Sequence, residues 1–454
     1  MTTTHPMRVS NRVGYGLGDT AFLLVWQGSA LFLLYFYTDV LGLPPGLAGA
    51  LFLAAMIWDA VSDPLVAAWA ERRAARIGRY TPIMAWAALP VGISYALMFL
   101  SPGSGVALTA IWALVTHLMF RTAYTVASMP YNTLPARLTT DSRERSVLSG
   151  FRVAGAATGG LAAAIATPLI VQASASQQSG YQIAALVVGG AAALLLFVSS
   201  RTSGEGRDLS GSVPATRYTA DLVELARETV HNGPLLRLVG VMALGAIGYG
   251  FFTTAILYFV VHVLGRPDLT TPVLALPALA TFLAAPFWVL VSGRTSKRIA
   301  LVLGVALAAT GYMLLALTPG GPLPLLFVAV ALAGAGGTAI PVTLWSMVPD
   351  AIEYGQLQRG RRVEARSFGL MTFVQKCAAG MTVLAAGAGL GLAGYVPDGP
   401  QTASASLAIV LMVTALPAGF MAAIAAVIWH YPIDQAAHRR ILDDLAEVRP
   451  SPEL

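Results

Sequence analysis

The sequence predicts an all-α membrane protein with twelve transmembrane helices in two six-helix halves. Of its 454 residues, 56% are hydrophobic and only 11% are charged. Soluble domains carry about 25% charged residues, so this composition is that of a polytopic membrane protein. Twelve apolar runs are long enough to span a bilayer, and one long polar segment separates six from six. Basic residues gather in alternate connections between these runs, as expected for a chain that crosses a membrane repeatedly.

The predicted spans follow the apolar runs in order. The first six lie at residues 13–38, 46–70, 82–101, 105–134, 147–172 and 180–200, and the second six at 236–264, 270–292, 299–317, 324–347, 367–392 and 404–430. The first run begins too late and continues too far for a cleaved signal peptide. The single cysteine, Cys377, excludes an internal disulfide framework and argues against a cysteine-rich metal site.

The basic residues set the predicted orientation. With twelve spans, the basic residues of the termini, the polar central segment and the larger connections fall on one side, and Arg266 is the only one in an opposite-side connection. The second-to-third connection is expected to carry Arg72, Arg73, Arg76 and Arg79. The positive-inside rule therefore places both termini in the cytoplasm, with the chain in the plasma (inner) membrane. The net charge of +6 then reflects contact with membrane lipids, and no nucleic-acid partner is expected.

The polar segment divides the chain into predicted domains. These are an N-terminal six-helix bundle (1–200), a cytoplasmic linker (201–235), a C-terminal six-helix bundle (236–432) and a cytoplasmic tail (433–454). Within the linker, residues 219–231 have the pattern of a short amphipathic helix that lies on the membrane surface.

The two halves resemble each other in their helix-ending signals. Pro135, predicted to end the fourth span, is followed seventeen residues later by Arg152, and Pro349, predicted to end the tenth, is followed at the same spacing by Arg366. Two six-span halves related by an internal repeat are the plan of major facilitator transporters, which bind substrate at the membrane midplane. The glycine run at 155–160 is typical of close helix packing in lipid.

The most informative polar motif is a pair of aspartates in the second span. Asp59 and Asp63 are four residues apart, so they share one face of the predicted helix. Carboxylates at membrane depth are costly and indicate a bound cation, a proton or a fixed positive partner. The alternative is a buried pair that caps neighbouring backbone groups.

Four blocks of sequence carry a resemblance to a known family. They are Gly14-Tyr15-Gly16-Leu17-Gly18-Asp19 with Phe36-Tyr37-Thr38-Asp39; Ile57-Trp58-Asp59-Ala60 through Asp63-Pro64 with Gly78-Arg79-Tyr80-Thr81-Pro82; Tyr124-Thr125 through Met129-Pro130-Tyr131 with Arg143-Glu144-Arg145; and Glu353-Tyr354-Gly355 with Phe373-Val374-Gln375-Lys376. In order and spacing they resemble the glycoside–pentoside–hexuronide:cation symporters of the major facilitator superfamily.

The resemblance implies a cation site and a substrate site. The cation site falls on Asp59, Asp63 and Thr125, whose oxygens suit Na⁺ and whose carboxylates can instead carry a proton. The substrate site implied by the resemblance, together with neighbouring positions, comprises Asp19, Ser128, Asn132, Arg152, Thr372 and Lys376. Two of these depart from the family: Ser128 replaces an aspartate of its best-known sugar carrier, and Asn132 replaces a sugar-stacking tryptophan. Both departures weaken the inference that the substrate is a galactoside.

Three further residues are singled out from the sequence itself. Trp345, near the end of the tenth span, is a candidate for stacking on the substrate, because sugars pack their C–H faces on aromatic rings. At the outer ends of their spans, Asp39 is interpreted as a residue that caps or orients the helix end, and His262 as an interfacial residue.

Arg121 lies within the fourth span, one turn before Thr125. An intramembrane arginine must find a partner. We hypothesise that it sits near the acidic pair and weakens or replaces Na⁺ binding, so that coupling uses protons or is lost. The alternative is that it extends toward the cytoplasm or pairs elsewhere in the bundle.

The sequence thus predicts a secondary transporter that carries a sugar-like polar solute together with Na⁺ or H⁺, as a monomer and without a cofactor. A rival prediction is a carrier of lysolipids or other amphiphiles. A membrane enzyme or a non-transporting sensor is disfavoured, because no metalloprotease, P-loop or Gly-x-Ser-x-Gly motif is found and the longest polar segment is too short for an output domain.

Overall fold

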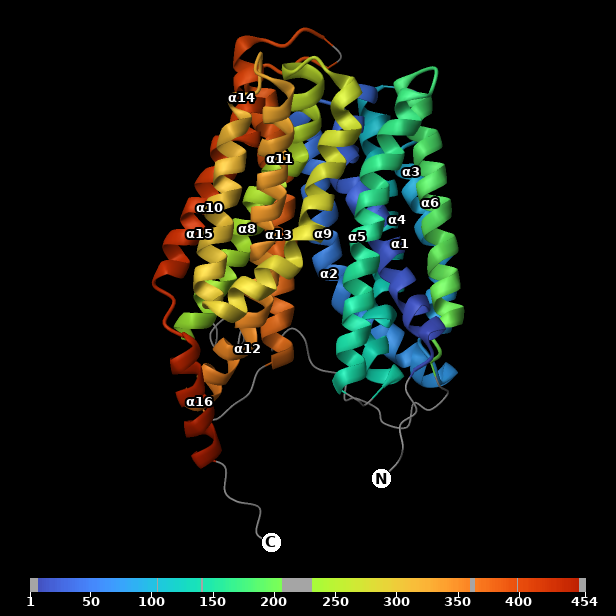
Figure 1. Ribbon diagram of the computed structural model, residues 1–454. Coiled ribbons are helices and arrows are strands. Elements are labelled where there is room, and N and C mark those ends of the chain that lie inside the picture. Colours follow the sequence, from blue (N-terminus) through green and yellow to red (C-terminus); the bar gives the residue numbers. More distant parts are fainter. Residues whose placement is uncertain are drawn as a thin grey trace. The chain divides into compact units, whose positions relative to one another are not determined.

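The computed structural model describes residues 7–103, 105–139, 142–205, 231–359, 364–397 and 399–448, and these residues form a set of long helices (Figure 1). The first six are α1 (Val9–Tyr35), α2 (Pro45–Ile77), α3 (Thr81–Met98), α4 (Val106–Leu138), α5 (Ser142–Gln172) and α6 (Gln177–Thr202). Those that follow are α8 (Gly233–Tyr258), α9 (Thr270–Arg294), α10 (Lys297–Leu315), α11 (Leu323–Gly337), α12 (Ala339–Arg359), α13 (Glu364–Leu392), α14 (Ala403–Val413), α15 (Ala415–Trp429) and α16 (Gln435–Val448).

The predicted number of spans is confirmed within the described residues. Twelve helical stretches are long and apolar enough to cross a membrane. The first span ends in a π-helical turn, η1 (Phe36–Val40), and the seventh in a second one, η2 (Phe259–Val263). The tenth span is built from α11 and α12 and the twelfth from α14 and α15.

The chain forms two compact units. Unit 1 comprises residues 1–215, 256–278 and 383–408, and unit 2 comprises residues 216–255, 279–382 and 409–454. Unit 1 therefore contains the first six spans, the end of α8, η2, the short helix η3 (Pro267–Leu269), the start of α9, the end of α13 and the start of α14. The division of the chain at residues 200, 235 and 432 stays a prediction.

Close contact between α1 and α5 is the feature of unit 1 that positions the site (Figure 1). A Cβ atom added at Gly155 would overlap the backbone oxygen of Gly16, and one added at Gly159 would overlap that of Thr20. The two backbones approach this closely only because these positions carry no side chain. The glycine run of α5 therefore serves the packing role expected from the sequence.

Several boundaries differ from the sequence prediction. Helix α2 continues to Ile77 and ends on Gly78, whose φ of 84° is a left-handed cap that favours glycine. Arg72, Arg73 and Arg76 therefore lie on the helix and not in a connection. Likewise, α12 contains Pro349 and runs on to Arg359, so this proline does not end the tenth span.

Within α4, Pro135 is also internal, since the helix ends at Leu138, although the apolar span does end at this proline. Of the amphipathic helix predicted at 219–231, residues 219–230 lie outside the described part of the chain.

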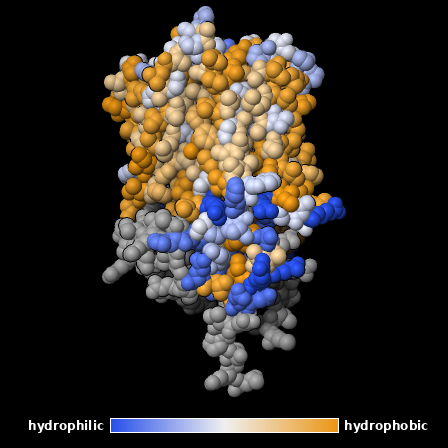
Figure 2. Space-filling model, turned by 90° about the vertical axis from the view of Figure 1, so that its left-hand side faces the viewer, coloured by the Kyte–Doolittle hydropathy of each residue, from blue (hydrophilic) through white to orange (hydrophobic). Residues whose placement is uncertain are grey.

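The surface of unit 2 is apolar along its spans and polar around α16. Figure 2 looks onto the side that carries α15 and α16, where orange side chains cover the spans and blue ones gather below them. The exposed apolar side chains include Leu303 and Met313 on α10 and Trp429 on α15. Such a surface is stable only in contact with lipid, because soluble monomers rarely expose large apolar patches.

Candidate functional site

Asp19 on α1 and Arg152 on α5 form an ion pair in unit 1. The Arg152 Nε lies 2.6 Å from Oδ2 of Asp19, and its Nη2 lies 3.4 Å from Oδ1. The Asp19 side chain is 8% exposed and that of Arg152 is 34% exposed. Arg152 is three residues before Gly155, so the close approach of α1 and α5 brings the guanidinium within reach of the carboxylate.

Tyr131 and Asn132 on α4 complete this polar group. The Tyr131 hydroxyl lies 3.0 Å from Asp19 Oδ2 and 2.9 Å from the backbone oxygen of Tyr15. The Arg152 Nη2 donates to Oδ1 of Asn132 at 3.1 Å, and the guanidinium carbon lies 5.2 Å from the centre of the Tyr131 ring. The structure thus brings together Asp19, Asn132 and Arg152, three of the predicted substrate-binding residues, and adds Tyr131 as the residue that orients Asp19.

The acidic pair of α2 meets α4 at Thr125. The Thr125 hydroxyl lies 2.8 Å from Oδ1 of Asp63 and 3.2 Å from Oδ1 of Asp59, so its one proton is shared between two carboxylates. Asp59 and Thr125 are each 1% exposed. The predicted cation-site residues therefore converge. Two carboxylate oxygens and a hydroxyl oxygen are suitable ligands for a hard cation, and a proton bound between the carboxylates would equally relieve their repulsion.

Arg121 is buried within α4, with 2% of its surface exposed. Its guanidinium carbon lies 4.5 Å from the centre of the Trp26 ring, and its Nε donates to Nε2 of His117 at 3.4 Å. His117 accepts at Nε2, so its ring proton is on Nδ1 and the imidazole is neutral. Asp59 and Asp63 are the carboxylates that interact electrostatically with the Arg121 guanidinium.

The remaining predicted substrate-binding residues lie in two places. Ser128 is buried on α4, three residues after Thr125. Trp345, Thr372 and Lys376 belong to unit 2. The Trp345 ring stacks on Phe368 with centroids 5.9 Å apart, and the exposed Thr372 donates its hydroxyl proton to the Phe368 backbone oxygen at 3.1 Å.

Asp39 and His262 are bonded to each other, a contact that the sequence analysis did not predict. Asp39 is 6% exposed and its carboxylate lies 3.0 Å from Nε2 of His262 and 2.5 Å from the Tyr395 hydroxyl. Asp39 is thus a buried carboxylate that is bonded to two other segments of the chain. The family block Phe36–Asp39 contained the signal for Asp39, but no pattern linked it to His262 or Tyr395.

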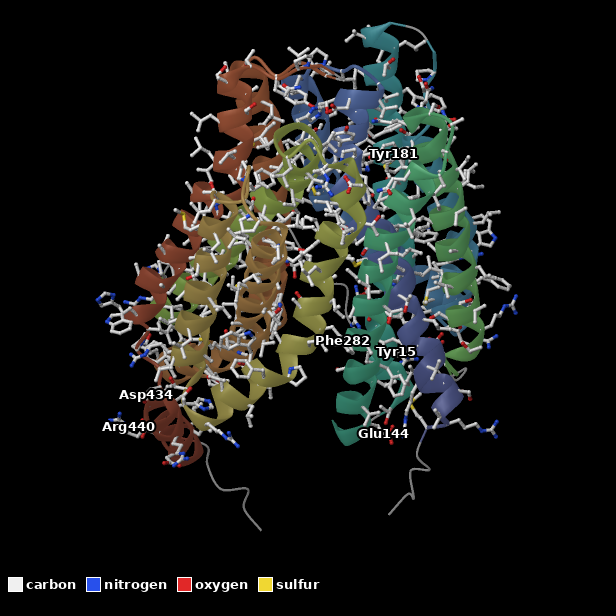
Figure 3. The ribbon with its side chains drawn as sticks, turned by 45° about the horizontal axis from the view of Figure 1, so that its top comes forward. Tyr15, Glu144, Tyr181, Phe282, Asp434 and Arg440 are labelled. Carbon is white, nitrogen blue, oxygen red and sulfur yellow. The ribbon has the colours of Figure 1, made fainter. Side chains whose placement is uncertain are left out.

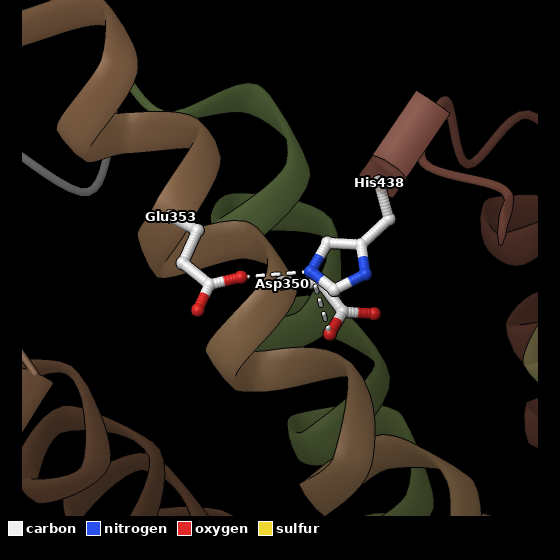
Figure 4. Close-up of side chains that lie close together, drawn as sticks. All are labelled: Asp350, Glu353 and His438. Atoms are coloured by element: carbon white, nitrogen blue, oxygen red, sulfur yellow. Dashed lines mark hydrogen bonds and ion pairs between the residues drawn. The ribbon is translucent and has the colours of Figure 1, made fainter. Parts of the chain in front are cut away.

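A second group missed by the sequence lies in unit 2, where α16 meets α12 (Figure 4). The Nε2 of His438 lies 2.7 Å from Glu353 Oε2 and 3.6 Å from Asp350 Oδ1, and the three ligand atoms are close enough to hold a metal ion. However, the Lys297 ammonium lies 2.7 Å from Asp350 Oδ2. A cation already compensates these carboxylates, so the arrangement is that of an ion-pair network that holds α16 against α12.

Comparison with known proteins gives a consistent result. The profile of a protein family described as MFS/sugar transport protein matches residues 14–435. YagG of Escherichia coli, whose name describes a candidate glycoside/cation symporter, is 32% identical over 82% of this chain and 80% of its own. The glucuronide carrier protein homolog of Escherichia coli is 27% identical over 95% of this chain and 94% of its own. The isoprimeverose transporter of Lactiplantibacillus pentosus is 25% identical over 96% and 91%.

Solved structures support the fold. A bacterial homolog of the human lysosomal transporter Spinster, in an inward-facing and unoccupied conformation, superposes with a TM-score of 0.69 at 16% identity and covers 99% of this chain and 100% of its own. The nucleoside transporter NupG has a TM-score of 0.62 at 12% identity over 93% of this chain and 100% of its own. At such low identity these similarities establish the architecture alone.

Proposed function

The chain belongs to the MFS/sugar transport protein family, and we propose that it uses the proton as the coupling ion of its transport cycle. Its function is cation-coupled symport of a sugar-like solute through the inner membrane, and it is a transporter and not an enzyme. The observation that carries the choice of ion is the buried guanidinium of Arg121, which lies on α4 one turn from the shared hydroxyl of Thr125.

The reason for proton coupling is electrostatic. Asp59 and Asp63 share one hydroxyl and interact electrostatically with one buried guanidinium, so a positive charge already offsets part of the charge of the two carboxylates. A Na⁺ ion would have to be desolvated next to that guanidinium, which is costly in a low-dielectric interior. A proton instead neutralises one carboxylate directly. Two carboxylates that share a site favour such protonation, because like charges close together cannot both ionise easily.

The substrate is proposed to bind at the Asp19–Arg152–Asn132 group. Arg152 and Asn132 are accessible, whereas Asp19 is buried behind them, so together they offer donors and acceptors for sugar hydroxyl groups. Because the charge of Arg152 is matched by Asp19 at 2.6 Å, a neutral sugar or glycoside suits this group better than a carboxylate-bearing one. Ser128 of unit 1 is proposed as a further substrate contact, and Trp345, Thr372 and Lys376 of unit 2 are proposed as substrate-binding residues from the sequence analysis.

The cycle is proposed to be alternating access between the predicted halves 1–200 and 236–432. Coupling requires that proton binding stabilise the conformation that binds the sugar, and the reciprocal effect then follows thermodynamically. Both termini are proposed to be cytoplasmic, and the protein is proposed to work as a monomer surrounded by lipid. The lysolipid carrier is not favoured, since the relatives that are named for a substrate are named for glycosides, a glucuronide or a sugar.

Counterflow in proteoliposomes tests this proposal. Labelled neutral pentosides and hexosides, a uronate and a lysolipid would each be offered, with a pH gradient or a Na⁺ gradient imposed separately. We expect accumulation of a neutral sugar driven by an inward proton gradient and unaffected by Na⁺. Strict dependence on Na⁺ would overturn the assignment of the coupling ion, and exclusive transport of the lysolipid would overturn the assignment of the substrate.

A further inference from the structure

The buried carboxylate of Asp39 belongs neither to the Asp19–Arg152–Asn132 group nor to the acidic pair of α2. Asp39 is on η1, the π-helical turn at the end of the first span, and its side chain is 0% exposed. A carboxylate at this depth needs hydrogen-bond donors and a charge partner. This end of unit 1 is marked in Figure 3 by Tyr181, whereas Glu144 marks the opposite end.

The neighbouring Thr38 and two segments far away in the sequence supply the hydrogen-bond partners of Asp39. The Oδ1 atom of Asp39 lies 3.0 Å from Nε2 of His262 and 2.5 Å from the Tyr395 hydroxyl, which lies 2.8 Å from the same nitrogen. The Oδ2 atom accepts from Thr38 at 2.6 Å, and the Thr38 hydroxyl lies 2.7 Å from that of Tyr258. Three segments of unit 1 are therefore joined through one carboxylate.

Packing around this group is tight. A Cβ atom added at Gly387 on α13 would overlap the backbone oxygen of Pro45 at the start of α2. The Gln172 side chain at the end of α5 donates to the backbone oxygen of Pro267 at 3.2 Å. The segments that supply His262 and Tyr395 are thus packed against the first six spans, so any opening of this end must break the bonds to Asp39.

The geometry fixes the proton on one ring nitrogen of His262. Burial and the Asp39 carboxylate raise the pKa of Tyr395, so its hydroxyl keeps its proton and donates it to Asp39. The Nε2 of His262 lies 3.0 Å from Oδ1 of Asp39, an oxygen that already accepts from the Tyr395 hydroxyl, so in this hydrogen bond the nitrogen is the N–H donor. A further proton can therefore be added only at Nδ1. That step converts a hydrogen bond between a neutral imidazole and a carboxylate into an imidazolium–carboxylate pair while the existing hydrogen bond is kept.

The other groups that face the imidazole do not compete for this role. The rings of Tyr35, Tyr258 and Tyr395 lie 6.2, 6.4 and 5.4 Å from it, centre to centre, and phenols are uncharged near neutral pH. On its own segment, Arg266 and Asp268 are bonded to each other at 2.8 Å. Among the described residues, Asp39 is therefore the charged group to which a proton on His262 responds.

We propose that Asp39, His262 and Tyr395 form a second proton-binding site, separate from the acidic pair of α2, and that proton binding to it stabilises the closed form of this end of the protein. We call these three residues the latch. In the proposed orientation this end faces the periplasm. Histidine is the side chain that most often serves as a pH switch in proteins, so external acid would hold the latch closed. This proposal depends on the proposed alternating-access function. It can nevertheless be tested without measuring transport.

Hydrogen exchange of the purified, substrate-free protein in nanodiscs tests the latch. Backbone exchange of residues 36–43, 259–269 and 390–397 would be compared at pH 5.5 and 7.5, after correction for intrinsic rates measured on an unfolded peptide. We expect these segments to be about five- to tenfold more protected at pH 5.5, the gain expected when a hydrogen bond to a carboxylate becomes an ion pair as well. Equal protection at the two pH values in the wild type would overturn the proposal.

Variants identify the titrating group. His262→Gln keeps a side-chain N–H donor but cannot be charged, so its protection should not depend on pH, and the exposed His430→Gln is the matched control that should behave as wild type. Asp39→Asn, which removes the charge partner, should also lose the effect if His262→Gln does not fold. Persistence of the pH effect in His262→Gln would assign it to another group and refute the latch. Failure of proton-driven transport with an intact exchange effect would refute the proposed coupling ion alone.

Discussion

Arg152 contacts both carboxylate oxygens of Asp19, with its Nε 2.6 Å from Oδ2 and its Nη2 3.4 Å from Oδ1. Such two-point contact depends on the planar fork of a guanidinium, which an ammonium group cannot reproduce. The same guanidinium packs over Tyr131 and donates to Asn132, so it holds three potential substrate contacts in one arrangement.

Replacing this arginine by lysine should therefore weaken sugar binding although the charge is kept. We expect Arg152→Lys to raise the Kd of the transported sugar about tenfold or more, since a fork with two hydrogen bonds becomes a point charge. Isothermal titration of the purified protein measures this effect. Arg201→Lys, at an exposed arginine that packs over Phe197, is the matched control and should leave the Kd unchanged. An unaltered Kd in Arg152→Lys would remove Arg152 from the substrate site.

The contact between α1 and α5 should tolerate no side chain at Gly159. Gly159→Val forces a side chain into the backbone of Thr20 and should cost about 1–3 kcal/mol of stability. The melting temperature in detergent, followed by intrinsic fluorescence, gives the readout. Gly150→Val lies on the same helix with nothing within 4 Å of the added Cβ, so it should be neutral. Equal melting temperatures for the two variants would contradict close packing as the reason for the glycine.

Removal of the buried guanidinium should change the ion that the acidic pair accepts. In Arg121→Met the fixed positive charge is lost while most of the side-chain volume is kept, so Asp59 and Asp63 become able to bind Na⁺. We expect uptake that is independent of Na⁺ in the wild type to become stimulated several-fold by Na⁺ in this variant. Arg121→Lys retains the charge and should stay independent of Na⁺. A wild type that already requires Na⁺ would show that the guanidinium does not exclude the ion.

The stability of the first turn of α16 should depend on pH because of one carboxylate, that of Asp434. The Ala437 N–H donates to Oδ1 of Asp434 at 2.7 Å, and this hydrogen bond lowers the pKa of the Asp434 carboxyl. A carboxyl with a lowered pKa in the folded state stabilises the helix at pH values above its ordinary pKa of about 3.9 and loses this contribution as the pH falls through the folded value.

Hydrogen exchange of residues 436–448 between pH 3 and 6 measures this contribution. We expect the protection of α16 in the wild type to fall at the acid end, relative to Asp434→Asn, whose amide still caps the helix but does not titrate. Asp443→Asn, at an exposed position of the same helix, should follow the wild type. If Asp434→Asn loses protection in acid to the same extent as the wild type, the cap is not the source of the pH effect.

The sequence could predict those features in which the interacting residues lie close together in the chain or within one motif. The twelve spans follow from apolar runs, and the sharing of a helix face by Asp59 and Asp63 follows from helical period alone. The small residues around Gly155 indicated close packing, and the family blocks indicated Asp19, Thr125 and Arg152. Each of these is a local pattern or a position within a motif.

The interactions that sequence reasoning missed join residues that no periodicity connects. Asp39 is bonded to residues 223 and 356 positions further along the chain, and its burial depends on how those segments fold back onto the first six spans. His438 lies in a tail predicted only as cytoplasmic, and its contact with Glu353 depends on where α16 docks. The extension of α2 to Ile77 was missed because charged residues end a hydropathy signal without ending a helix.

The central claim is that the carboxylates of α2 carry the proton that drives uptake. Sugar accumulation in proteoliposomes under an imposed inward proton gradient, compared between the wild type, Asp59→Asn and Asp63→Asn, tests it most directly, with equilibrium exchange as the control that each variant still folds and binds sugar. We predict that each variant abolishes accumulation above the external concentration while exchange without a gradient persists. Undiminished proton-driven accumulation in both variants would contradict the account.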